Sequence, residues 1–195
     1  MIGVLLLHTT FGFIKEIPSL PWLSYELGVV AIPLFFMVSG YLLLNRPQIT
    51  YSYSIKKILS ILRFIGLFIL ITYIWHLLEG PTNWCEDIFG WTTQRGRYSF
   101  FWYFCATIII LAVLPVLKWV YDRYPLYLLA ILILAQAVVH VINIYCLFGW
   151  HEHLLRQSFR LYNWLGYFVL GGMFSKIRLP FKVNFIVLLL VAIAY

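Results

Sequence analysis

Long apolar runs separated by short polar segments extend along the whole chain. The runs fall at about residues 1–13, 25–45, 62–79, 100–118, 125–148, 161–175 and 182–195. They are continuous and do not alternate with period two, which indicates helices and not strands. A membrane-spanning helix needs about 20 mostly apolar residues, and several runs reach that length. We therefore predict an all-α fold, a polytopic transmembrane helix bundle of about six to seven helices, forming a single domain over residues 1–195.

The composition supports a membrane protein. Hydrophobic residues make up 63% of the chain and charged residues only 11%, whereas a soluble domain carries about 25% charged residues. The first and last apolar runs, 1–13 and 182–195, are too short to cross a bilayer at a rise of about 1.5 Å per residue. We therefore expect a piece of a longer polytopic protein, truncated at both ends.

The basic residues predict an orientation. Most Lys and Arg side chains lie in the segments 46–63, 118–125 and 176–182, which are read as loops on one side of the membrane. Because Lys and Arg favour cytoplasmic loops, these loops and the N-terminus are predicted to face the cytoplasm. The net charge of +7 is then a signal of topology, so the expected partner is the lipid bilayer and no nucleic acid is expected.

One apolar run is interrupted in an informative way. The segment PLFFMVSGYLL, residues 33–43, carries a proline and a Ser-Gly pair. Pro33 removes a backbone hydrogen bond and is expected to kink the helix. Ser39 and Gly40 are expected to let another helix approach closely. The run is therefore predicted to be a bent, closely packed helix inside the bundle.

Polar residues within the apolar runs are candidates for function, because ionisable groups are costly in a membrane. His8 lies in the first run. Two polar stripes follow helical spacing: Gln136, His140 and Asn143, and Thr72, His76 and Glu79. Each stripe is either interhelical hydrogen-bonding glue or the wall of a polar cavity for a hydrophilic ligand. The segment His151-Glu152-His153 lacks a third ligand at sensible spacing, so no metal site is expected.

Several segments together resemble a known family. The segment VVAIPLFFMVSGYLLLNR (Val29 to Arg46) resembles the second-helix signature of the membrane acyltransferase-3 family, bacterial integral-membrane enzymes that O-acylate sugars. Four more segments resemble the family in the same order along the chain: GVLLLHTT with His8, YSIKKILSILRFI (Tyr53 to Ile65), FFWYFCATIIILAVLPVL (Phe100 to Leu117) and YNWLGYFVLGGMFSK (Tyr162 to Lys176). The family's basic stretch commonly has two arginines three residues apart. This chain has Lys57 at the first of these positions and Ser60 at the second, and Arg63 follows three residues after Ser60.

The resemblance implies transfer of an acyl group, commonly acetyl from acetyl-CoA, to a sugar hydroxyl of a surface polysaccharide or glycolipid. It places the protein in the bacterial inner membrane, with acyl-CoA as donor substrate and no bound cofactor. His8 is the expected general base, because a sugar hydroxyl needs a base with a pKa near 7. A transient acyl-histidine is a variant of this mechanism.

The resemblance also suggests which residues bind the substrates. Arg46, Lys56, Lys57 and Arg63 are expected to bind the phosphates of CoA, although the positive-inside rule alone would explain them. Arg95 and Arg97, in the predicted outer loop 80–99, are expected to contact the sugar acceptor, as is Ser39. Two alternatives are a multi-pass transporter or flippase, and an inactive truncated membrane protein.

Overall fold

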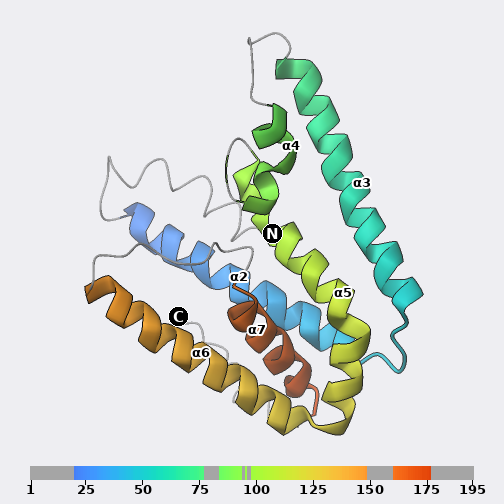
Figure 1. Cartoon of the computed structure of the whole chain (residues 1–195), viewed down its shortest axis with the longest axis vertical. Helices are drawn as coiled ribbons and strands as arrows, with labels where there is room; N and C mark the ends of the chain where they lie inside the picture. The colour runs from blue at the N-terminus through green and yellow to red at the C-terminus, as the bar shows by residue number, and fades with distance from the viewer. Residues whose placement is uncertain (1–19, 77–83, 94, 96–97, 149–159, 177–195) are drawn as a thin grey trace. The chain divides into compact units, whose positions relative to one another are not determined.

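The computed structural model describes residues 20–76, 84–93, 95, 98–148 and 160–176. These residues form six α-helices, one short 3-10 helix and no strand (Figure 1), which confirms the all-α fold. In chain order the elements are α2 (Leu20–Leu44), α3 (Tyr51–His76), α4 (Trp84–Thr93), η1 (Ser99–Phe101), α5 (Trp102–Arg123), α6 (Pro125–Phe148) and α7 (Leu161–Phe174). The predicted helices at 1–13 and 182–195 lie outside the described residues.

Three of the described helical segments are long and apolar enough to cross a membrane. They are Tyr51–Ile74, Ser99–Arg123 and Pro125–Ile142, and α2 contributes a shorter apolar segment, Val30–Leu44. Many of their large apolar side chains are exposed in the isolated chain. Exposed apolar helix surfaces of this length suit lipid as a solvent, so the chain is an integral membrane protein.

The predicted loops 46–63 and 118–125 are wrong for most of their length. α3 begins at Tyr51, eleven residues before the apolar run at 62, and α5 continues to Arg123, so that Tyr124 alone separates it from α6. Lys and Arg are good helix formers, and their long side chains can reach the interface from within a helix. A helix therefore continues into basic sequence that a hydropathy pattern assigns to a loop. The predicted outer loop 80–99 likewise contains α4.

The described residues belong to two compact units, of which the first comprises residues 1–46 and 167–195. In this unit α2 crosses the C-terminal part of α7 at very short range. A Cβ atom built on Gly40 would overlap the backbone carbonyl of Phe168, and one built on Gly171 would overlap the backbone of Met37. The close helix approach predicted at Ser39-Gly40 is thus confirmed at Gly40. Pro33 lies within α2, and the kink expected there stays a prediction.

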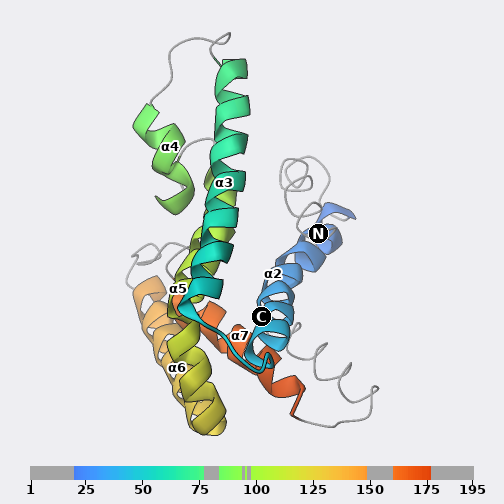
Figure 2. The same ribbon diagram turned by 90° about the vertical axis from the view of Figure 1, so that its right-hand side faces the viewer.

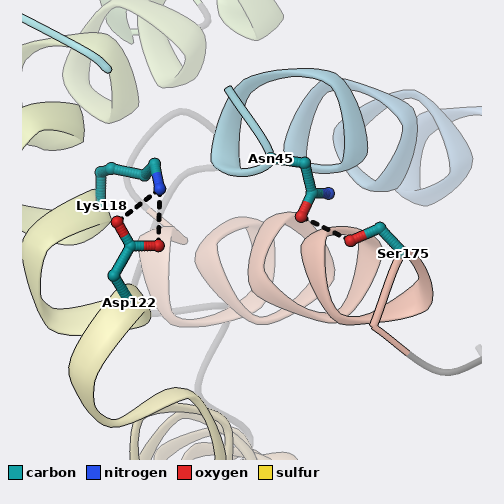
Figure 3. A network of polar contacts seen from close by, with 4 residues as sticks. All are labelled: Asn45, Lys118, Asp122 and Ser175. Carbon is teal, nitrogen blue, oxygen red and sulfur yellow. Dashed lines mark hydrogen bonds and ion pairs between the residues drawn. The ribbon is translucent and has the colours of Figure 1, made fainter. Parts of the chain in front are cut away.

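Hydrogen bonds join the C-terminal ends of α2 and α7 (Figure 3). The Ser175 hydroxyl donates to Asn45 Oδ1 at 2.5 Å, and Asn45 Nδ2 donates to the Gly172 carbonyl at 3.2 Å. The two helices therefore end on the same side.

The second unit, residues 47–166, contains α3 to α6 and the first turns of α7. α3 packs along α5 (Figure 2) around Ile65, Tyr98 and Phe101, with half-buried neighbours such as Phe68 and Trp91. The Phe68 ring meets the Phe101 ring edge-on, with centroids 5.0 Å apart. Edge-to-face aromatic pairs of this kind stabilise a core beyond the area they bury.

Thr72 shows what one of the polar stripes does. Its hydroxyl donates to the Phe68 carbonyl at 2.8 Å, so the hydrogen bond between Thr72 and Tyr98 must use the Tyr98 hydroxyl as donor. At Thr72 the stripe therefore acts as hydrogen-bonding glue. The side chains of His76 and Glu79 lie outside the described residues.

Candidate functional site

The buried face of α3 repeats at helical spacing. Buried or half-buried positions recur four and three residues apart in turn, at Ser54, Ile58, Ile61, Ile65, Phe68 and Thr72, with half-buried Tyr53, Ile69 and Tyr73 beside this line. This spacing follows one face of an α-helix, and the contacts of Ile65 and Phe68 with Phe101 show that the face packs on α5. The remaining faces of α3 are exposed in this chain.

Two of the predicted donor-binding residues lie on the opposite face. Lys56 and Arg63 are seven residues apart and both exposed, so they lie within about 20° of each other around the helix and about 10 Å apart along it. By the same geometry they point about 180° away from the face that packs on α5. Lys57 lies between these two faces, and its Nζ atom is 5.9 Å from the centre of the Tyr53 ring.

Arg63 lies deep along its span. It is twelve residues after Tyr51, the start of the span-length segment Tyr51–Ile74, which corresponds to about 18 Å of helix rise. The whole segment is about 36 Å long by the same measure. An arginine within a helix that is apolar enough to span a membrane is costly in lipid and usually has a function or a polar partner. On sequence alone this residue was grouped with a loop, and only the true start of α3 shows its depth.

The basic residues at the end of α5 have a different environment. Lys118 Nζ makes an ion pair at 2.5 Å with the Asp122 carboxylate, one turn further along the same helix (Figure 3). The Arg123 guanidinium lies 4.2 Å from the centre of the Trp119 ring. The charge of Lys118 is therefore offset locally, whereas Lys56 and Arg63 present theirs on an open face.

The other predicted substrate-binding residues are not brought together by the described structure. Arg46 follows the end of α2 in the first unit and is exposed, while Ser39 is half-buried beside the helix-crossing residue Gly40. Arg95 is exposed in the second unit, and its backbone N–H donates to the Gly90 carbonyl at 2.9 Å. His8 and Arg97 lie outside the described residues, so their roles stay predictions.

The polar stripe of α6 approaches the start of α7. Gln136 is half-buried, and its Oε1 atom lies 3.4 Å from the position that a Cβ on Gly166 would take. His140, one turn later, is exposed, and the side chain of Asn143 lies outside the described residues. The Gln136 amide thus lies in van der Waals range of the α7 surface at Gly166.

A buried amide on α7 was missed by the sequence analysis. Asn163 is only 4% exposed, and its Oδ1 atom has no hydrogen-bond partner. An asparagine near the start of a helix usually caps it or faces water, so the sequence carries no signal for its burial. Beside it, Trp164 is 1% exposed and lies 5.3 Å, centre to centre, from the Trp102 ring.

Taken with the span-length helices, these features define a polytopic, all-helical integral membrane protein. The whole chain, residues 1–195, matches the acyltransferase-3 family, described as an acyltransferase domain. The protein belongs to this family, which confirms the resemblance found in the sequence. No curated protein and no solved structure matches the chain.

Proposed function

We propose that the protein is a membrane-bound O-acyltransferase that moves an acyl group, with acetyl as the first to test, from acyl-CoA to a sugar hydroxyl of a cell-surface polysaccharide or glycolipid. Family membership over the full chain supports an acyltransferase. The observation that carries the proposal for the donor is the outward face of α3, where exposed Lys56 and Arg63 lie on one line of an apolar helix.

The chemistry of the donor fits this face. The nucleotide end of acyl-CoA carries several phosphate charges, which guanidinium and ammonium groups bind through charge-assisted hydrogen bonds. Arg63 points away from α5, so lipid would meet its charge unless another group covers it. A polyanion bound along Lys56 and Arg63 offsets both charges. Lys57 and Arg46 are proposed to contribute further positive charge.

His8 is proposed as the general base. It takes the proton from the sugar hydroxyl as the hydroxyl oxygen attacks the thioester carbonyl carbon. The carbon–sulfur bond then breaks, the acyl group stays on the sugar oxygen, and the CoA sulfur leaves as the thiol once it has received a proton. The basic face is proposed to be cytoplasmic, in the inner membrane of a bacterium, with the acceptor bound toward the other side near Arg95, Arg97 and Ser39.

The positive-inside rule is the competing explanation for the basic residues, because it requires their charge but no ligand. A matched pair of variants separates the two explanations. Arg63→Gln and Lys118→Gln each remove one positive charge, and both residues lie in helices whose basic ends are predicted to be cytoplasmic. Only Arg63 lies on the proposed donor face, because Lys118 belongs to α5. The charge of Lys118 is also paired with Asp122.

The test measures the apparent KM for acetyl-CoA in membranes that contain each variant. Arg63→Gln is expected to raise it about tenfold, the loss of one charge-assisted hydrogen bond, while Lys118→Gln leaves it within about twofold. A protease-protection assay on both variants checks that the topology is intact. An equal KM in the two variants, with topology unchanged, would contradict the donor assignment.

A further inference from the structure

The starting observation is the buried amide oxygen of Asn163 on α7. Asn163 is 4% exposed and its Oδ1 atom accepts no hydrogen bond. An unsatisfied buried polar atom destabilises the fold and calls for an explanation, such as a water, an ion or a ligand that binds it. Because this atom is an acceptor, its natural partner is a group that donates an O–H or N–H bond.

Other groups that suit a sugar contact neighbouring residues of α7. Gly166 is three residues after Asn163 on α7, which is about one helical turn. At Gly166 the Gln136 amide of α6 packs against α7. Trp164 adjoins Asn163 in the sequence, and its ring lies against that of Trp102 at the start of α5. Within the second unit, an amide from α6 and a ring from the start of α5 thus reach the first turns of α7.

The directions of the helices place the start of α7 at one end of the spans. α5 and α6 are separated by Tyr124 alone, so they cross in opposite directions and the start of α5 lies at the level of the end of α6. α7 starts on that side too, because it is the next span along the chain. His140, one turn beyond Gln136, therefore lies toward the level of Asn163. The basic ends of α3 and α5 are at the opposite side.

We infer that Asn163 accepts a hydrogen bond from a hydroxyl of the sugar acceptor, with Gln136 and Trp102 alongside. The inference rests on the proposed function, and it names the place where the acceptor binds. A sugar suits the group, because its hydroxyls donate to amide oxygens and its C–H faces pack on aromatic rings. The position at the end opposite the basic ends of α3 and α5 separates this acceptor region from the donor face of α3.

The experiment replaces Asn163 with leucine, which has nearly the same size and no polar atom. Ser54→Ala is the matched control, since the Ser54 hydroxyl is also buried, 2% exposed, without a hydrogen-bond partner, but lies near the start of α3. Transfer is measured in membranes with radiolabelled acetyl-CoA. The acceptor probe is a total glycan and glycolipid extract of the bacterial envelope, titrated by mass. Thermal unfolding in detergent reports whether each variant folds.

Asn163→Leu is expected to raise the apparent KM for the extract about fivefold to tenfold. Its KM for acetyl-CoA should stay at the wild-type value and its unfolding temperature at or above the wild-type value, and Ser54→Ala should change neither KM. Two results would overturn the inference: unchanged KM values in Asn163→Leu, or an equal rise in its KM for the extract and its KM for acetyl-CoA. Transfer by the wild type would still uphold the proposed function. No transfer by the wild type would overturn both.

Discussion

The crossing of α2 and α7 makes the substitution Gly40→Ala the sharpest test of the fold. The added Cβ would overlap the Phe168 carbonyl oxygen and lie 2.6 Å from the carbonyl carbon. These are backbone atoms of a helix, so no side-chain rotation relieves the overlap. The two helices must move apart, and helix association in membranes depends on close van der Waals packing.

The expected loss of stability follows from what that movement uncovers. Phe36, Met37 and Leu44 on α2 are 1%, 3% and 1% exposed, and separation of the helices weakens their contacts. Insertion of one methyl group into a well-packed core typically costs 1–3 kcal/mol. Because backbone meets backbone here, we expect a value near the upper end, about 3 kcal/mol. The assay is unfolding by SDS in mixed micelles, followed by circular dichroism.

Gly66→Ala is the control. Gly66 lies within α3, and nothing lies within 4 Å of a Cβ built on it. The same change there should stabilise the helix by up to about 1 kcal/mol, because alanine is the better helix former. If Gly40→Ala unfolds at the same SDS concentration as Gly66→Ala, the close crossing is refuted. Gly171→Ala should be costly alone but add little to Gly40→Ala, since one separation admits both methyl groups.

Two further predictions concern α3. Thr72→Val and Tyr98→Phe, combined in a double-mutant cycle, should show a coupling energy of about 0.6–1.7 kcal/mol in SDS unfolding. This is the range expected for a hydrogen bond between side chains in a membrane protein. A coupling energy of zero would show that the bond between the two hydroxyls does not stabilise the fold. Lys56→Gln should raise the KM for acetyl-CoA more than Lys57→Gln, because only Lys56 shares a helix face with Arg63. The reverse order would move the donor to another face of α3.

The sequence predicted the helices best where apolar residues alone determine them. The predicted bounds 125–148 agree with α6, and 161–175 differs from α7 by one residue. Helix ends that extend into polar sequence were predicted poorly, as at Tyr51 and Arg123, because a hydropathy pattern reports where lipid is and not where backbone hydrogen bonds stop. The 3.6-residue period on α3 became informative only once its start was known.

Among the candidate residues, those with a local sequence signal were predictable and those placed by long-range contacts were not. Gly40 was predictable, because a Ser-Gly pair in an apolar run indicates close packing whatever the partner. Its contact with Phe168, and that of Gly171 with Met37, were not predictable, because they join segments far apart in the sequence. Asn163 was missed for a similar reason, since the burial of a residue near a helix start depends on segments distant in the sequence. Long-range placement of this kind has no local signature in one sequence.

The measurement that decides the proposed function compares wild type with His8→Ala. Each protein is inserted in membranes and supplied with radiolabelled acetyl-CoA, and the label in extracted glycans and lipids is counted. Wild type is expected to label a sugar-containing fraction, and His8→Ala to reduce that label to background while its amount in the membrane is unchanged. Equal labelling by both proteins would contradict His8 as the base, and no label from abundant, inserted wild type would contradict acetyl transfer to a sugar.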